Sequence, residues 1–333
     1  MALLHIGTYQ ANGGRGLVPV ELRDDGTLVP GEPFADAANA SFGANGNGLT
    51  YLVDERDEGA INVLRRVGED WERVARVPSG GAAPCYLSLS PDGGRLAVAN
   101  YKGGSAALYR LENGIPQAPP ALFRNEGHGP DQERQDGPHV HCARFSSDGS
   151  ALYLVDLGAD QVLCLALSED GVGETSVAWT APAGSGPRHL LLHPARPRAL
   201  VLSELAATLT LIGRGPLGFE TLDRQPTATP SFAGENLGGH LALNPGGTRA
   251  YVSNRGDDTL AVFALVNGGF EVLQHVPSGG AHPRHFALLE AERKLVVAHE
   301  KDGMVASFVI EADGRLRATG HSITVPGACF VLA

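Results

Sequence analysis

Short runs of alternating apolar and polar residues recur along this chain and predict β-strands throughout. One pattern returns several times: a turn similar to Pro-Asp-Gly, then an apolar strand, then a small polar residue that closes it. Full copies occupy 91–101, 147–157, 194–204, 245–255 and 290–300, and shorter copies occupy 3–9 and 47–55. Alternation with a period of two is typical of half-buried strands, and a 3.6-residue period that would predict helices is missing.

The spacing of the copies predicts the architecture. The closing polar residues are Thr8, Asp54, Asn100, Asp156, Ser203, Asn254 and His299, at intervals of 45 to 56 residues. A period of roughly 40 to 50 residues with short strands is typical of a β-propeller, with one four-stranded sheet per repeat. We therefore predict an all-β, seven-bladed β-propeller that forms a single domain over 1–333. Its last blade should pair 3–8 with 328–333, since each end of the chain lacks half a hairpin, and this pairing removes two open sheet edges.

Hairpin geometry predicts which residues lie together. The start of the strand before each copy and the end of the copy lie at the same end of a hairpin. One predicted ring contains Cys85, His141, Arg188, Gly239 and Arg284. The other contains the closing residues, followed by Glu55, Tyr101, Glu204, Arg255 and Glu300. The opposite ends carry ordinary turn sequences, so we expect a functional channel mouth where the two rings lie.

An insertion at 124–141 makes one interval longer than the others. Long loops in compact repeats are usually functional or disordered. This loop brings Arg134 and leads into His139 and His141, which lie two apart and therefore face the same side of a strand. The two histidines could instead hold a metal with a third ligand such as Glu204.

The arginines and the closing residues could also have purely structural roles. The arginines of the mouth could simply neutralise Glu204 and Glu300, and the short polar closing residues could cap turns.

Composition narrows the function classes. The chain has 26 Lys+Arg against 37 Asp+Glu, a net charge of −11, which argues against nucleic-acid binding. A few local arginines can still bind a small anion. No apolar run approaches the ~20 residues of a membrane span, and the first residues do not read as a secretory signal. Four cysteines without a C-x-x-C motif form no disulfide framework, so we expect a cytoplasmic protein with reduced thiols.

Several long strings of the chain resemble one known family. They are IGTY, PCYLSLSPDGGRLAVANYKGGS, GHGPDQERQDGPHVHCARFSSDGSALYLVDLGADQV, GSGPRHLLLHP, YVSNRGDDTLAVF and PRHF. Over essentially the whole length, the chain is similar to the seven-bladed lactonase family, whose best-known activity is that of 6-phosphogluconolactonase. The family also includes proteins related to carboxymuconate cyclases. The resemblance therefore implies lactone chemistry, and we expect no cofactor and no metal.

Hydrolysis of a lactone needs a general base, a group that stabilises the oxyanion, and groups that hold the substrate. We predict His139, His141 or His189 as the base, with Glu204 or Glu300 orienting the imidazole. Arg188 and Arg284 could stabilise the oxyanion, and Arg134 and Arg255 could bind a phosphate as a fork. Further substrate-binding candidates are His285, Tyr101, Asn100 and Glu55. A G-x-S-x-G motif is missing, which argues against a serine nucleophile.

The expected reaction is opening of a sugar δ-lactone, 6-phosphogluconolactone to 6-phosphogluconate. Two alternatives are a lactonising cyclase of the carboxymuconate type and a non-catalytic propeller that binds an anionic sugar or peptide. The expected partner is a small anionic lactone, without nucleic acid or membrane, and the protein is expected to be a monomer or a weak homo-oligomer.

Overall fold

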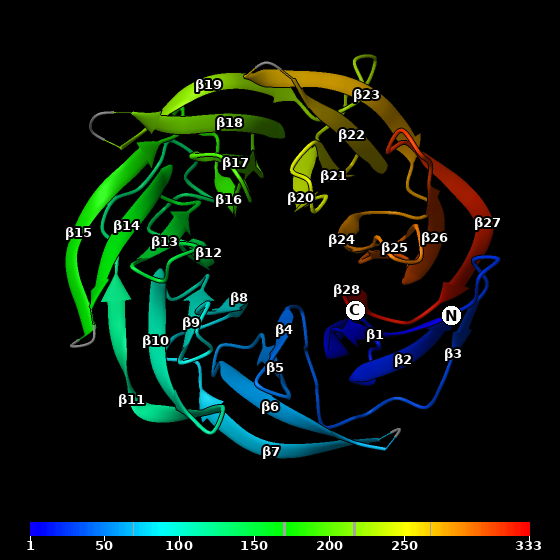
Figure 1. The fold of residues 1–333 in the computed structure, drawn as a ribbon, viewed down its shortest axis with the longest axis horizontal. Coiled ribbons are helices and arrows are strands. Elements are labelled where there is room, and N and C mark those ends of the chain that lie inside the picture. The colour runs from blue at the N-terminus through cyan, green and yellow to red at the C-terminus, as the bar shows by residue number, and fades with distance from the viewer. Residues whose placement is uncertain (69, 169–170, 216–217, 267) are drawn as a thin grey trace. The chain divides into compact units, whose positions relative to one another are not determined.

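The computed structural model describes residues 1–68, 70–168, 171–215, 218–266 and 268–333. In this part of the chain the strands form seven four-stranded sheets (Figure 1). The only helix is a 3-10 turn, η1 (Gln10–Asn12), among the residues described. No helix in the same ranges is long and apolar enough to cross a membrane. The prediction of an all-β chain with one four-stranded sheet per repeat is confirmed.

The chain divides into two compact units. The first contains Met1–Ala38, Leu191–Arg214 and Thr221–Ala333, and the second contains Asn39–Leu190 and Gly215–Glu220. The expected single domain over 1–333 stays a prediction.

Three complete sheets belong to the second unit, in blue to green in Figure 1. Their strands are β4 (Gly43–Gly46), β5 (Leu49–Asp54), β6 (Ala60–Val67) and β7 (Asp70–Pro78); β8 (Pro84–Leu89), β9 (Arg95–Asn100), β10 (Ser105–Glu112) and β11 (Ile115–Arg124); and β12 (Val140–Phe145), β13 (Ala151–Asp156), β14 (Gln161–Ser168) and β15 (Gly171–Thr180). In each sheet the strands follow one another in chain order and pair antiparallel.

Three further sheets belong to the first unit. Their strands are β20 (Leu237–Leu243), β21 (Arg249–Arg255), β22 (Thr259–Val266) and β23 (Gly269–Pro277); β24 (Pro283–Leu289), β25 (Lys294–His299), β26 (Met304–Ile310) and β27 (Leu316–Thr324); and β1 (Ala2–Thr8), β2 (Leu17–Leu22), β3 (Leu28–Pro30) and β28 (Ala328–Leu332). The remaining sheet has the order β16 (Pro187–Leu192), β17 (Arg198–Ser203), β18 (Thr208–Gly215) and β19 (Gly218–Pro226).

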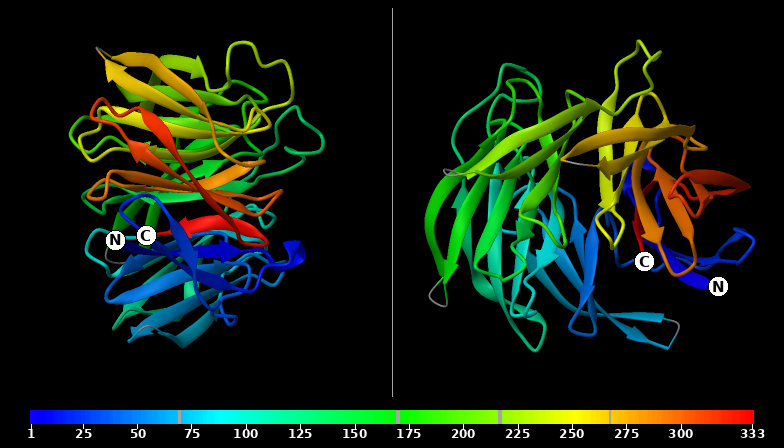
Figure 2. Two further views of the ribbon diagram at one scale, coloured as in Figure 1. Left: turned by 90° about the vertical axis from the view of Figure 1, so that its right-hand side faces the viewer. Right: turned by 45° about the horizontal axis from the view of Figure 1, so that its top comes forward.

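The two ends of the chain complete one sheet together. β28 pairs antiparallel with β1, with His5 opposite Leu332 and Gly7 opposite Phe330. Figure 2 shows the red C-terminal strand beside the blue N-terminal strand. The predicted closure of the last blade by residues 3–8 and 328–333 is confirmed.

Apolar residues on the first three strands of neighbouring sheets form the core. Tyr51 and Val53 of β5 pack with Leu87 of β8 and Val98 of β9 in one such cluster. The fourth strand of each sheet is more exposed, as in β27, where only Leu316 is buried. Because burial on both faces fixes the inner strands, their ends are firmly placed, and the candidate site residues lie at those ends.

Candidate active site

A β-bulge marks the start of the first strand in several sheets. The ladder between β12 and β13 skips from Val140 to Cys142, so His141 has no opposite residue. The same shift leaves out Cys85 in β8, Arg284 in β24 and Cys329 in β28. Bulges re-aim a side chain and are common beside active sites. Most of the ring predicted from hairpin phase therefore consists of bulge residues, and Cys329 is a member that the sequence analysis missed.

Gly239 takes the bulge position in β20. The ladder between β20 and β21 is interrupted there and leaves out Gly239 and His240. A Cβ on Gly239 would lie 2.4 Å from Ser253 Oγ and 2.7 Å from Pro283 O. Close packing therefore excludes a side chain at this position of β20.

The residue two positions before three of these bulge residues has a left-handed backbone. The φ angles are 52° at Ala83 before Cys85, 65° at His282 before Arg284 and 73° at Gly327 before Cys329. Glycine suits such a position best, and a residue with a bulky side chain is uncommon there. His282 is therefore an unexpected occupant, and strained residues of this kind cluster at functional sites.

His282 belongs to a compact polar group of the first unit with Glu300 and Arg284. Its Nδ1 lies 3.2 Å from Glu300 Oε2, and Arg284 Nη1 lies 3.4 Å from the same oxygen. The backbone N–H of His282 donates to Asp258 Oδ1 at 2.7 Å, and its carbonyl accepts from Glu300 N at 3.0 Å. These contacts hold the imidazole with Nδ1 donating to a carboxylate. In the neutral tautomer with this contact, Nε2 carries the lone pair, and it makes no hydrogen bond within the described residues.

Electrostatics keep Glu300 ionised. Burial raises the pKa of this carboxyl, but the Arg284 charge, the His282 hydrogen bond and the Arg255 charge together hold it well below its usual range. An ionised carboxylate on one imidazole nitrogen fixes the tautomer and makes the other nitrogen a better base. Glu300 thus orients an imidazole as predicted, although the ring is that of His282.

Glu204 and Arg255 form a buried ion pair in the same unit. Arg255 Nη2 lies 2.8 Å from Glu204 Oε2, and both side chains are about 5% exposed. The same nitrogen donates to Gly238 O at 2.7 Å. Arg255 is therefore engaged by protein acceptors, which offers no support for its predicted role as a phosphate fork.

Two aromatic contacts complete the surroundings of this group. The Arg284 guanidinium lies 5.2 Å from the ring centroid of Tyr9, a cation–π contact. His285 is buried against His240 and Phe330, and its Nδ1 accepts from Val331 N at 3.3 Å. His285 therefore packs and pairs within the fold, and its predicted role in substrate binding stays a prediction.

Arg188 is the centre of a polar group in the second unit. Its Nη1 lies 3.0 Å from His141 Nε2 and 3.2 Å from His189 Nε2. A guanidinium only donates, so both nitrogens accept and are unprotonated. His141 Nδ1 faces Cys85 Sγ at 3.7 Å. Three predicted residues thus lie together, but the base nitrogens of His141 and His189 already face a cation.

His139 contacts the insertion loop and Tyr101. Its ring stacks on Tyr101 at 4.5 Å, Nδ1 faces Tyr101 O at 3.0 Å, and Nε2 faces Asp136 Oδ1 at 3.1 Å. Arg134 Nη2 donates to the Tyr101 hydroxyl at 3.3 Å. Buried Gln135 anchors the loop through Leu157 O at 2.9 Å. The insertion is therefore an ordered loop that presents Arg134 beside Tyr101.

The closing residues connect strands. Asn100 Nδ2 donates to Ser79 O at 3.2 Å, and Asn254 Nδ2 donates to Thr227 O at 2.7 Å. His299 occupies the equivalent position, and its Nε2 lies 3.0 Å from Ser278 Oγ. Burial lowers the pKa of His299. These side chains bind the end of the preceding sheet, so the contacts of Asn100 are structural.

Glu55 directly follows β5 in the second unit. Asp57 is the main cause that raises the pKa of Lys102, and the charge of Glu55 adds to this effect. The substrate-binding roles of Asn100 and Glu55 stay predictions.

A metal site finds no support in these contacts. No group of three or more His, Cys, Asp or Glu side chains suited to a metal occurs in the described ranges. His139 and His141 also turn their ring nitrogens to different partners, and an arginine approaches His141 Nε2. The placement of all predicted residues around one mouth stays a prediction.

Sequence reasoning missed His282. It lies in SGGAHPRHF (278–286), a near copy of SGGAAPCYL (79–87) in which His282 and Arg284 replace Ala83 and Cys85. Aligning these two copies would have revealed it.

Comparisons with known proteins agree with this picture. Residues 3–333 match the family model described as "Lactonase, 7-bladed beta-propeller". The 6-phosphogluconolactonase of Bacillus subtilis is 29% identical over 336 residues, covering 97% of this chain and 95% of that protein.

Two solved structures are similar along their full length. A protein from Lactobacillus plantarum has a TM-score of 0.91 at 27% identity, covering 99% of this chain and 98% of that one. The periplasmic gluconolactonase of Pseudomonas aeruginosa has a TM-score of 0.89 at 25% identity, covering 100% and 99%. The family model spans nearly all residues, so the predicted seven-bladed β-propeller and the resemblance are confirmed. This chain belongs to the lactonase family of seven-bladed β-propellers.

Proposed function

We propose that this protein hydrolyses a sugar δ-lactone, with 6-phosphogluconolactone as the substrate and 6-phosphogluconate as the product. The observation that carries the proposal is the imidazole of His282, oriented by Glu300 with Arg284 on the same carboxylate oxygen. A base and a cation beside it are two of the elements that ester hydrolysis requires. The name of the Bacillus subtilis relative supports this choice of substrate.

In this mechanism His282 Nε2 removes a proton from water while the water oxygen attacks the lactone carbonyl. The carbonyl oxygen becomes an oxyanion, which the guanidinium of Arg284 stabilises. A guanidinium carries five N–H donors, and Glu300 accepts from Nη1. When the tetrahedral intermediate collapses, the bond from the carbonyl carbon to the ring oxygen breaks. The imidazolium returns its proton to that oxygen, which yields the hydroxy acid.

His282 is favoured over the histidines predicted from the sequence. Both ring nitrogens of His139 have acceptors, and Nε2 of His141 and His189 face Arg188. Arg188 stays a candidate for binding an anionic substrate, because its guanidinium is buried.

We also propose a cytoplasmic protein that works as a monomer or weak homo-oligomer. Its four cysteines are free thiols, as expected in a reducing compartment. The similar protein of Pseudomonas aeruginosa is described as periplasmic, so fractionation of the native host is the appropriate check.

A lactone panel tests the proposed function. Purified protein is offered 6-phosphogluconolactone, glucono-δ-lactone and a muconolactone, and acid release is followed by pH-stat with spontaneous opening subtracted. We expect catalysed opening of the sugar lactones, fastest for the phosphorylated one. Turnover of the muconolactone alone would favour the cyclase alternative. Rates equal to the spontaneous background on all three would favour a non-catalytic binding propeller.

Arg134 is expected to bind the substrate phosphate. Arg134→Ala should raise KM for 6-phosphogluconolactone about 10- to 100-fold with little change in kcat, because a charged hydrogen bond made equally in ground and transition states is lost. Arg134→Lys should recover part of the affinity, since lysine cannot fork two oxygens. Steady-state kinetics on glucono-δ-lactone provide the control, which should hardly change. An equal rise in KM for both lactones would contradict a phosphate contact.

A further inference from the structure

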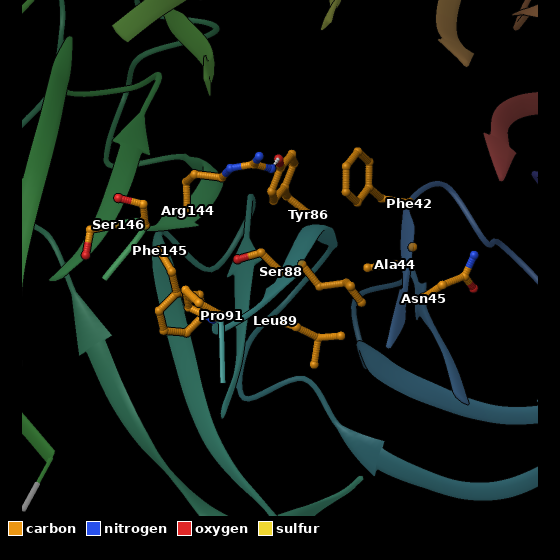
Figure 3. A pocket seen from close by; sticks show the side chains of 13 residues that line it. Phe42, Ala44, Asn45, Tyr86, Ser88, Leu89, Pro91, Arg144, Phe145 and Ser146 are labelled. Atoms are coloured by element: carbon orange, nitrogen blue, oxygen red, sulfur yellow. Dashed lines mark hydrogen bonds between the residues drawn. The ribbon is translucent and has the colours of Figure 1, made fainter. Parts of the chain in front are cut away.

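A cavity lies in the second unit, along β4, β8 and β12 and toward the turn ends of these strands. It has a volume of about 450 Å³. Figure 3 shows Arg144 extending toward Tyr86, with Phe42 beyond it. Its lining includes Phe42, Tyr86, Leu89, Pro91, Arg144 and Phe145. None of the residues that line this cavity is acidic. The cavity is large enough for a small organic molecule.

Arg144 brings a cation into this cavity without a carboxylate partner. Its Nη1 donates a hydrogen bond to the Tyr86 hydroxyl at 3.4 Å. No Asp or Glu of 1–68, 70–168, 171–215, 218–266 or 268–333 forms an ion pair with it. Partly burying a cation is unfavourable unless an anion or several acceptors compensate it. The site is therefore electrostatically incomplete.

The remaining donors of Arg144 face the open space. Neither Nε nor Nη2 makes a hydrogen bond within the described chain, and neither is sealed from solvent. These two nitrogens form the edge of the guanidinium that matches the two oxygens of a carboxylate. Burial also raises the pKa of Tyr86, so its hydroxyl keeps its proton.

Aromatic and apolar side chains form the walls. Phe42 and Tyr86 stack with their ring centroids 4.1 Å apart, and Leu89, Pro91 and Phe145 line the cavity beside them. Such walls favour a flat, apolar body, while the cation favours an anionic group. Tyr86 also contacts His189 edge-on at 5.5 Å, so its ring separates the cavity from the group around Arg188.

We propose that this cavity is a binding site for a small ring-bearing carboxylate, with the carboxylate on the free edge of Arg144 and the ring against Phe42 and Tyr86. The site is distinct from the candidate active site and does not depend on lactonase activity.

Binding is measured by isothermal titration calorimetry on the full chain with three probes: benzoate, inorganic phosphate and benzyl alcohol. We expect saturable benzoate binding and at least tenfold weaker binding of each of the other two, since phosphate lacks the ring and benzyl alcohol lacks the charge. Phosphate binding as tightly as benzoate would overturn the role of the aromatic walls. Benzyl alcohol binding as tightly would overturn the role of Arg144.

Two variants make the test specific. Arg144→Met should weaken benzoate binding about 10- to 100-fold, the loss expected when charged hydrogen bonds are removed. Arg144→Lys keeps the charge and serves as a second test if the methionine variant does not fold. The lysine variant should bind benzoate more weakly than wild type. The matched control is Arg65→Met, at an exposed arginine of β6, which should bind like wild type. Unchanged affinity in Arg144→Lys and Arg144→Met, or equal loss in Arg65→Met, would overturn the proposal.

Discussion

Replacing His282 with alanine is expected to lower kcat for sugar-lactone hydrolysis by ~10²–10⁴-fold, the usual contribution of a general base. The reason is geometric: Glu300 holds Nδ1 at 3.2 Å, which directs the unprotonated Nε2 away from the carboxylate. Ala83 shows that alanine accepts the same left-handed backbone, with φ 52° against 65° at His282. The variant should therefore fold normally, and circular dichroism melting verifies this before the kinetics are compared.

The pH profile separates a base from a merely structural histidine. A general base must be unprotonated to accept a proton, so kcat/KM of the wild type should fall toward acidic pH. His282→Ala should remove this acidic limb as well as lowering the rate. Glu300→Gln should keep the shape of the site and still lower kcat, because an amide does not select the tautomer in the same way.

The variants His141→Ala and His189→Ala test the alternative that the general base belongs to the group around Arg188. Full kcat in His282→Ala, together with a large loss in either of the other two, would place the base in the group around Arg188, as the sequence alone predicts. Full kcat in His139→Ala, His141→Ala, His189→Ala and His282→Ala would argue against imidazole catalysis altogether.

Deleting residues 328–333 is expected to abolish cooperative folding. All five residues of β28 are buried, and they pair with β1 at the end of the chain. Loss of Phe330, Val331 and Leu332 removes about 1.5–3 kcal/mol of burial each. That sum is comparable to the entire stability of a typical protein, about 5–15 kcal/mol. The deletion also exposes the edge of β1, which invites aggregation.

Thermal and urea unfolding measure this effect. Removal of the exposed Ala333 alone is the matched control, and its melting temperature should stay within a few degrees of wild type. Val331→Asp should destabilise in the same direction as the deletion, because it buries an unpaired charge. A deletion variant with an unchanged melting temperature would show that β28 does not complete the sheet.

Much of the fold is readable from the sequence because its signals are local. Strands such as β9, β17 and β25 carry apolar residues between a turn and a polar end, and that pattern repeats at nearly constant spacing. The fourth strands could not be read in this way. β27 and β15 are mostly exposed, so burial leaves almost no alternation in their sequences.

The candidate site was only partly readable. Hairpin phase located His141, Cys85 and Arg284 at the same position of their sheets, because strand length and turn fix which ends coincide. It could not show that each is a bulge residue, since an extra residue changes the pairing without leaving a distinct sequence signal. The sequence analysis did not identify His282 for a related reason, because a residue directly before a proline is typical of a turn.

The sequence by itself determined the repeat, the number of blades and the closure of the last sheet by both ends. Each of these follows from alternation and spacing, which the chain carries locally. Only the tertiary structure decided which partner each charge takes. Arg255 meets Glu204 although 51 positions separate them, Arg188 donates to two imidazoles, and Glu300 orients His282 instead of a histidine of the second unit. A hydrogen bond depends on distances of about 3 Å between atoms of different strands, and sequence spacing does not carry that information.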